Sequence, residues 1–180
     1  MDGPLKNLLV VDLTRVLVGP YCTMMLSDMG ARVIKVEAPG IGDDSRKFGP
    51  FVKDNSAYFM SLNRGKESIA LNLKDEEDKE IFLKILSKAD ILVENFKPGT
   101  LEKWGFGWKD MCKKFPKLIY ASASGFGQTG PLKELPAYDM VVQGMGGLMS
   151  VTGQPNSEPT RVGTSIGDIT AALFTTIGIN

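Results

Sequence analysis

One aspartate near the end of the chain has the surroundings of a reacting group. Asp168 lies in the stretch RVGTSIGDI, just before the apolar run Ala171-Ala172-Leu173-Phe174. The apolar run predicts a helix, so the simplest interpretation makes Asp168 its N-cap, a position that aspartate favours. A carboxylate at a helix start is also held ionised by the helix dipole, and Gly167 leaves room for a substrate to approach. Asp168 is therefore a candidate covalent nucleophile as well as a candidate cap.

The absence of histidine narrows the chemistry open to this sequence. The 180 residues include two cysteines, Cys22 and Cys112, and no histidine. Ser-His-Asp and Cys-His catalysis are excluded within this sequence, and neither a Cys/His zinc site nor a disulfide framework is expected. Cys22 lies among methionines and is expected to be a buried structural thiol, and nothing marks Cys112 as activated. A carboxylate, lysine, tyrosine, serine or cysteine has to do any acid, base or nucleophilic work.

Two further motifs point to ligands only weakly. The stretch GFGQTG at residues 125–130 follows a predicted strand and resembles a dinucleotide fingerprint, but Pro131 interrupts the helix that such a fingerprint must enter. Asp43 and Asp44 could contribute to a metal site. Adjacent acids in a glycine-rich loop are usually solvated, so no metal site is expected.

The composition is that of a globular domain with no excess of either charge. Hydrophobic residues make up 43% and charged residues 23%, and Lys+Arg and Asp+Glu are both 21. This balance argues against a nucleic-acid partner. No apolar run approaches the ~20 residues that cross a membrane, so no membrane partner is expected. The first residues resemble neither a signal nor a transit peptide. A cytoplasmic location is expected, with a mitochondrial one open for a eukaryotic source.

The elements that must position the candidate residues alternate between strands and helices. Hydrophobic patterns predict strands over residues 8–13, 32–37, 68–73, 90–96 and 118–123. Helices are predicted over 21–29, 75–89, 101–115 and 139–149, the third of them interrupted by Gly105 and Gly107. This order is typical of an α/β fold with a doubly wound parallel sheet. Ligands then bind beyond the carboxyl ends of the strands, which lie at residues 14–20, 38–44, 95–99 and 124–130.

Six segments, taken in order, resemble the class III CoA-transferases. They read VVDLTRVLVGPYCTMMLSDMGARVIKVEAPGIGD, SLNRGKESIALNLK, ADILVENFKPGTLEKWGF, IYASASGFGQTGP, YDMVVQGMGGLMSVTG and RVGTSIGDI. Together they extend over nearly the whole chain. The most specific part is VENFKPG, followed by GFGQTGP and a later GD.

The resemblance implies a fold larger than this chain. Residues 1–180 would form the N-terminal portion of a Rossmann-like large domain, and the small domain and the C-terminal part would lie outside the sequence. Family members are longer and assemble as intertwined homodimers of interlocked rings. The chain is accordingly expected to be a fragment, a truncated product or a split subunit.

The resemblance also implies an activity and a set of site residues. The reaction is transfer of CoA between an acyl-CoA and a free carboxylic acid. Members that use a small dicarboxylate such as succinate or glutarate are the nearest match, and formate, oxalate and carnitine relatives share these motifs. It proceeds through an aspartyl-CoA thioester on the residue that matches Asp168, with no cofactor beyond CoA itself. Positions that match CoA or substrate contacts are Arg15, Val16, Leu17, Ala38, Leu71, Asn95, Phe96, Lys103 and Tyr138.

Two alternatives stay open. The family includes an α-methylacyl-CoA racemase branch, which needs a histidine just before the aspartate that matches Asp139. This chain has Tyr138 there, which disfavours proton shuttling by that route. The other alternative is a catalytically incompetent fragment or a CoA-binding subunit that keeps the pocket.

Overall fold

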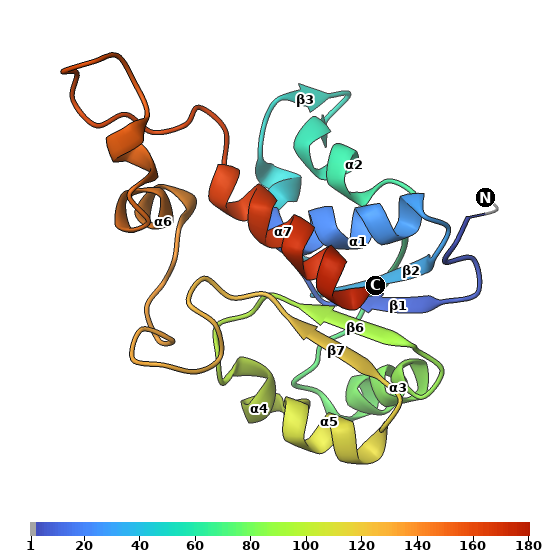
Figure 1. The fold of residues 1–180 in the computed structure, drawn as a ribbon. Coiled ribbons are helices and arrows are strands. Elements are labelled where there is room, and N and C mark those ends of the chain that lie inside the picture. Colours follow the sequence, from blue (N-terminus) through green and yellow to red (C-terminus); the bar gives the residue numbers. More distant parts are fainter. Residues whose placement is uncertain (1–2) are drawn as a thin grey trace.

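A five-stranded parallel sheet forms the centre of the molecule, with helices on both faces (Figure 1). The computed structural model describes residues 3–180. The strands are β1 (Leu9–Asp12), β2 (Arg32–Glu37), β5 (Glu67–Ala70), β6 (Ile91–Glu94) and β7 (Ile119–Ser122). Their order is β5-β2-β1-β6-β7, and every pair is parallel. The predicted α/β fold with a parallel sheet is confirmed.

One face of the sheet is covered by α3 (Glu76–Leu86), α4 (Thr100–Trp104) and α5 (Trp108–Lys114) (Figure 1). Val11 and Leu92, from the two central strands, pack there in one cluster with Phe82 and Leu86 of α3, and all four are fully buried. Asp75 caps α3 by accepting the Glu77 N–H, and acids fill the first turn, as the helix dipole favours.

The other face carries α1 (Val18–Asp28) and α7 (Ile166–Ile179), which lie against each other, with α2 (Ala57–Asn63) alongside α1 (Figure 1). Val10 and Val93 pack there with Leu26 of α1 and Ala172 of α7. Cys22 belongs to the same cluster and is 0% exposed, and burial raises the pKa of its thiol to about 11. The expectation of a buried structural thiol is confirmed.

Some boundaries differ from the prediction for local reasons. The helix predicted over 21–29 begins earlier, at Val18, because Pro20 lies in the first turn, where its missing N–H costs nothing. The helix predicted over 101–115 is two helices, because Gly105 ends α4 in the left-handed conformation, with φ of 86°. A small hairpin, β3 (Phe51–Val52) and β4 (Asn55–Ser56), and the helix α2 were not predicted.

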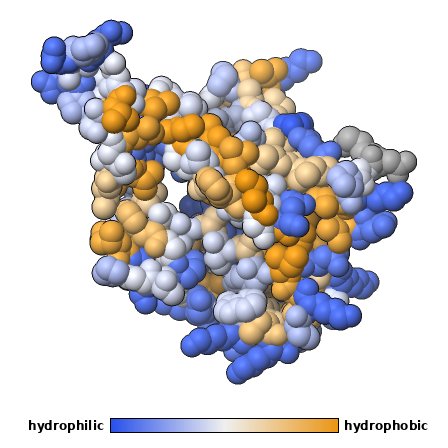
Figure 2. All heavy atoms as spheres, in the orientation of Figure 1, coloured by the Kyte–Doolittle hydropathy of each residue, from blue (hydrophilic) through white to orange (hydrophobic). Residues whose placement is uncertain are grey.

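The region after β7 leads to the last helix. It contains α6 (Asp139–Met145) and a short 3₁₀ turn at Leu148–Val151, where a single helix over 139–149 was predicted. Apolar side chains remain exposed along α6 and α7, with Met145 at 59% and Phe174 at 72%, and Figure 2 shows apolar surface gathered over these helices. Within residues 3–180, no helix has the length and apolar character that a bilayer crossing requires.

Candidate active site

A cavity of about 910 Å³ opens at the carboxyl ends of the central strands. Its walls come from the loops after β1, β6 and β7, from the segment leading into α6, and from the start of α7. The chain passes from β1 to β2 on one side of β1 and later returns to β6 on the other, so β1 and β6 flank the point where the strand order reverses. Parallel α/β sheets bind their ligands in the crevice at this point.

Most of the residues predicted from the sequence come together around this cavity. Arg15, Val16 and Leu17 follow β1, and Asn95 and Phe96 follow β6. From the later part of the chain, Tyr138 and Asp168 also line the cavity.

Three predicted contact residues lie outside the cavity lining. Ala38 is exposed directly after β2, and Leu71 is 5% exposed just beyond β5, so both lie at the carboxyl edge of the sheet. Lys103 is exposed on α4. Their roles as CoA contacts stay predictions.

Asp168 lies inside the first turn of α7 and is not its cap. The helix begins at Ile166, with Ser165 in the N-cap position. The N-cap interpretation is therefore wrong, because the helix starts ahead of the apolar run that predicted it. The carboxylate is half-buried in the cavity wall. Burial, and then the charge of Asp139, raise the pKa of Asp168 above its ordinary value.

A pair of polar side chains on α6 holds the backbone on both sides of the α7 start. Asp139 accepts a hydrogen bond from the Gly167 N–H at 2.8 Å. Gln143, which is 2% exposed, accepts from the Val162 N–H at 2.8 Å and donates to Asp139 Oδ2 at 2.7 Å. The position of Asp168 is therefore set by α6. The sequence pattern predicted a helix there but not its contacts with the start of α7.

Gly167 is required by packing. A Cβ atom at this position would lie 2.7 Å from Val142 Cγ2 and 3.1 Å from Asp139 Oδ1. Any larger residue would push α6 and α7 apart. The glycine that was expected to give a substrate access also allows the two helices to meet.

The loops after β1 and β6 are joined by one side chain. The Arg15 N–H donates to Asn95 Oδ1, and Asn95 Nδ2 donates to the Arg15 carbonyl, both at 2.9 Å. Arg15 also forms an ion pair with Asp44 at 2.5 Å. The two sides of the crevice are thus tied together beside the cavity.

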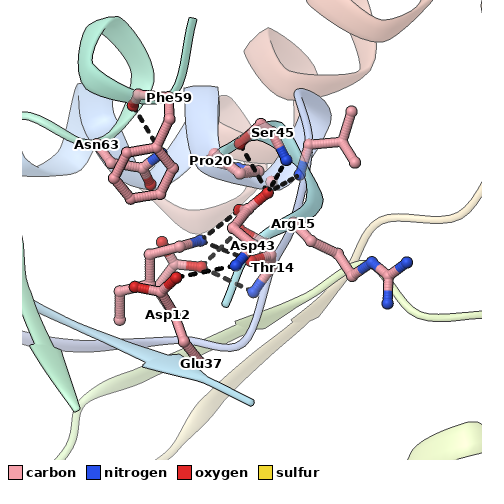
Figure 3. Close-up of polar contacts among 12 residues, drawn as sticks. Asp12, Thr14, Arg15, Pro20, Glu37, Asp43, Ser45, Phe59 and Asn63 are labelled. Atoms are coloured by element: carbon pink, nitrogen blue, oxygen red, sulfur yellow. Dashed lines mark hydrogen bonds and ion pairs between the residues drawn. The ribbon is translucent and has the colours of Figure 1, made fainter. Parts of the chain in front are cut away.

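A buried charge network lies behind the β1 loop, and the sequence analysis missed it. Figure 3 shows Asp43 turned toward Ser45 and toward the loop around Thr14. Asp43 is 3% exposed and pairs with Lys35 at 2.9 Å, so the expectation that it is solvated is wrong. Asp12 is 0% exposed and pairs with Lys66 at 3.0 Å.

Tyr58 of α2 is a further residue that senses the charge of Asp168 and that the sequence did not suggest. Burial, and then the charges of Asp168 and Asp43, raise the pKa of its phenol. The hydroxyl group is therefore a neutral donor within electrostatic reach of Asp168 at physiological pH.

The two weak motifs form no site among the described residues. No group of three or more acidic or cysteine side chains within residues 3–180 is placed to hold a metal ion. The loop GFGQTG runs into irregular chain up to Tyr138 and enters no helix, so it lacks the geometry of a dinucleotide fingerprint.

A parallel sheet with a cavity and a carboxylate at its switch point has the arrangement that is typical of ligand-binding α/β domains. The chain belongs to CoA-transferase family III, whose family model matches residues 5–180. It is 57% identical to an acetyl-CoA:oxalate CoA-transferase of Acetobacter aceti, over 98% of this chain and 46% of the relative. It is 48% identical to a succinyl-CoA:mesaconate CoA-transferase of Haloarcula marismortui, over 98% of this chain and 47% of the relative.

A human succinyl-CoA:glutarate CoA-transferase is 45% identical, over 95% of this chain and 39% of the relative. Among solved structures, a CAIB/BAIF family protein from Brucella suis superposes with a TM-score of 0.94 at 43% identity, over 99% of this chain and 48% of the other. The chain spans between 39% and 48% of the length of these four proteins.

Proposed function

We propose that the protein carrying this chain transfers CoA between an acyl-CoA and a free carboxylic acid, with Asp168 as the covalent nucleophile. The observation that supports this most directly is the position of Asp168. It is a half-buried carboxylate in the wall of the switch-point cavity, held there by α6. The raised pKa makes its oxygen more basic, and hence more nucleophilic, once ionised.

The reaction balances as two exchanges at one carboxylate. An Asp168 oxygen attacks the thioester carbonyl carbon, the C–S bond breaks, and a mixed anhydride and CoA thiolate result. The thiolate attacks the Asp168 carbonyl carbon and expels the first acid as its carboxylate, which leaves an aspartyl-CoA thioester. The acceptor carboxylate then repeats these steps in reverse order, takes up CoA and regenerates the Asp168 carboxylate.

The other cavity residues suit the binding of an elongated anionic thioester. The crevice between the β1 and β6 loops presents Val16 and Phe96 as apolar surface and Arg15 as a cation. Tyr138, 72% exposed at the start of α6, can donate a hydrogen bond to a substrate near Asp168. The proposed pocket therefore includes the seven predicted residues that line the cavity.

The proposed acceptor is a small dicarboxylic acid. The relatives named above are described as acting on oxalate, mesaconate or glutarate, each of which carries two carboxylates. Within the cavity lining, Arg15 and Lys133 supply cationic groups that can receive a second carboxylate. We further propose an intertwined homodimer for the protein, with no cofactor besides CoA. The cytoplasmic location stays a prediction.

Covalent trapping tests the nucleophile. The protein is incubated with succinyl-CoA and then treated with hydroxylamine or borohydride, and its peptides are analysed by mass spectrometry. We expect modification of the peptide that contains Asp168 and none in the Asp168→Asn variant. A label on another residue would disprove the assignment, as would transfer by Asp168→Asn at the wild-type rate.

Calorimetry with CoA and dephospho-CoA tests the pocket separately. We expect both to bind, since the β1 and β6 loops form most of the crevice. Binding without transfer would favour the alternative of a CoA-binding subunit over an enzyme. Absence of binding by the protein would defeat the pocket assignment itself.

A further inference from the structure

The β1 loop contains a backbone conformation that its sequence disfavours. Val16 has φ of 69°, in the left-handed region. A β-branched residue rarely adopts this conformation, because its Cβ substituents crowd the backbone. Val16 lies in the cavity wall, and strained residues of this kind persist only where their surroundings hold them. The surroundings of Val16 therefore need an explanation.

Most of the backbone N–H and carbonyl groups of residues 14–16 form hydrogen bonds with side chains from four other elements or loops. The Thr14 N–H donates to Asp12 Oδ1 at 2.8 Å, and the Thr14 carbonyl accepts from Lys35 Nζ at 2.7 Å. Asn95 binds both backbone groups of Arg15. The Val16 N–H donates to Asp43 Oδ1 at 3.1 Å. Figure 3 shows Asp12 and Asp43 turned toward this loop.

Two of these side chains form one buried ion pair. Lys35 is 1% and Asp43 is 3% exposed, and their charged atoms lie 2.9 Å apart. Buried ion pairs are weak devices for stability, because an apolar pair of similar volume is often as stable. Lys35 and Asp43 each also form a hydrogen bond with the backbone of the strained loop, which suggests that the pair positions this loop. Lys35 binds the Thr14 carbonyl and Asp43 binds the Val16 N–H, so the pair holds the strained loop at two points.

Asp43 is itself fixed by rigid neighbours. Its Oδ1 accepts from the Ser45 backbone N–H at 2.9 Å and from the Ser45 hydroxyl at 2.7 Å. The Asp43 N–H donates to Glu37 Oε2 at 2.9 Å, and Glu37 is held by a two-bond contact with Arg46. The carboxylate therefore has little freedom to follow the loop if the loop moves.

We propose that Lys35 and Asp43 are positioning residues that hold residues 14–16 in the conformation that receives the CoA thioester, so that the loop need not be ordered on binding. This proposal rests on the proposed function. Neither side chain is among the residues that line the cavity. Their removal should therefore weaken substrate binding while chemistry at Asp168 continues.

The test compares two neutral double variants of the intact protein. Lys35→Met with Asp43→Ala removes both charges and the acceptor of the Val16 N–H. Lys35→Met with Asp43→Asn also removes both charges but keeps an oxygen acceptor. We expect KM for succinyl-CoA to rise about 10-fold or more in the alanine pair, as the ordering of two backbone residues implies, with kcat within about threefold of wild type. The asparagine pair should recover at least part of this loss.

Amide hydrogen exchange supplies a readout without substrate. The peptide covering residues 13–18 should exchange faster in the alanine pair than in wild type. Leu86→Ala is the stability control, because the Leu86 side chain, at the end of α3, is fully buried in the core. It should lower the melting temperature and change neither KM nor exchange in the β1 loop.

The outcomes separate the proposal from the function on which it rests. If wild type neither binds CoA nor transfers it, the proposed function fails and this inference with it. If wild type is active and a folded alanine pair keeps wild-type KM and exchange, the inference alone is overturned. Should neither pair fold, Ser45→Ala removes one donor that orients Asp43, and we expect KM to rise about twofold to threefold. An unchanged KM and exchange in Ser45→Ala would then overturn the inference.

Discussion

Asp139 accepts the Gly167 N–H at 2.8 Å, and through this bond α6 holds the turn of α7 that carries Asp168. Burial raises the pKa of Asp168, and the negative charge of Asp139 raises it further. One side chain on a neighbouring helix therefore both places the proposed nucleophile and adjusts its basicity. Asparagine removes the charge and keeps one oxygen acceptor for the Gly167 N–H, while it gives up the acceptor that Gln143 uses.

Asp139→Asn should move the acid limb of the activity profile to lower pH. Without the neighbouring negative charge, the pKa of Asp168 falls toward its ordinary value, so the nucleophile is ionised at lower pH. The less basic carboxylate should also react more slowly at neutral pH, by about threefold to tenfold. The measurement is kcat/KM between pH 4 and 8, with the exposed Asp110→Asn as the charge-matched control. An unshifted acid limb would show that Asp139 acts through packing alone.

Asp168→Asn should abolish transfer and stabilise the fold at neutral pH. Burial, and then Asp139, raise the pKa of Asp168, so folding favours the protonated carboxyl. This favourable contribution is complete below the unfolded value of 3.8 and is lost as the pH rises through the folded pKa. At pH 7 the ionised group is a net cost to the folded state, which asparagine removes. Activity should fall on the order of 10³-fold or more.

Urea unfolding at pH 3.5 and pH 7 measures the stability part of that prediction. The variant should be more stable than wild type at pH 7, and the two should converge at pH 3.5. A variant that is less stable at pH 7 would show that attraction between the carboxylate and the helix start outweighs burial.

Gly167→Ala should impair the site, whereas Gly163→Ala should not. The added methyl group at position 167 meets Val142 and Asp139 at distances shorter than van der Waals contact, while position 163 has open space within 4 Å. We expect Gly167→Ala to lower kcat by about 10-fold or more by displacing Asp168 and to cost about 1–3 kcal/mol of stability. Thermal unfolding and steady-state rates check both variants. Equal effects at the two positions would contradict the packing argument.

Acid should unfold the protein through Asp12. Burial alone would raise the pKa of Asp12, but Lys66, Lys35 and two threonine hydroxyls outweigh it and hold that pKa well below its usual range. Its ionised form therefore stabilises the fold above the unfolded value of 3.8, and this contribution is lost as the pH falls toward the folded pKa. Unfolding free energies measured from pH 7 down to pH 2 should fall below about pH 4.

Variants of Asp12 and Lys66 test whether these two buried charges stabilise the fold as an ion pair. Asp12→Asn should cost about 3–5 kcal/mol at pH 7, because it leaves the buried Lys66 ammonium without its counter-charge. Adding Lys66→Met should restore much of the loss. If the single and double variants are equally unstable, the two charges do not act as a pair.

The sequence predicted the parts of this structure that hydrophobic periodicity encodes. The strands around Val10, Val33, Leu92 and Tyr120 appear where apolar runs indicate them. The gathering of seven predicted residues around one cavity followed from the family resemblance and from the parallel-sheet rule, which brings the carboxyl ends of the strands to one edge.

The parts that the sequence could not predict depend on partners distant in the chain. Lys35 alternates with apolar residues in β2 and is typical of an exposed strand position, yet it is buried because Asp43 and the Thr14 carbonyl receive its charge. Local sequence favoured Asp168 as the cap of the last helix, whereas Ser165, another preferred capping residue three positions earlier, takes that position. The contact of Gln143 with Val162 spans two elements and leaves no periodic trace.

The paired hydrogen bonds between Asn95 and Arg15 make the amide side chain act as one more peptide group of β6. Switch-point crevices exist because the loops after two neighbouring strands lead to helices on opposite faces of the sheet. Here the Asn95–Arg15 hydrogen bonds join these two loops. These hydrogen bonds fix the distance between the β1 and β6 loops, and hence the width of the crevice at that point. Ligands of different bulk must be accommodated at the opposite wall, which the irregular chain between Ser122 and Tyr138 provides. Engineering a change of acid substrate should therefore begin in that segment and leave Asn95 in place.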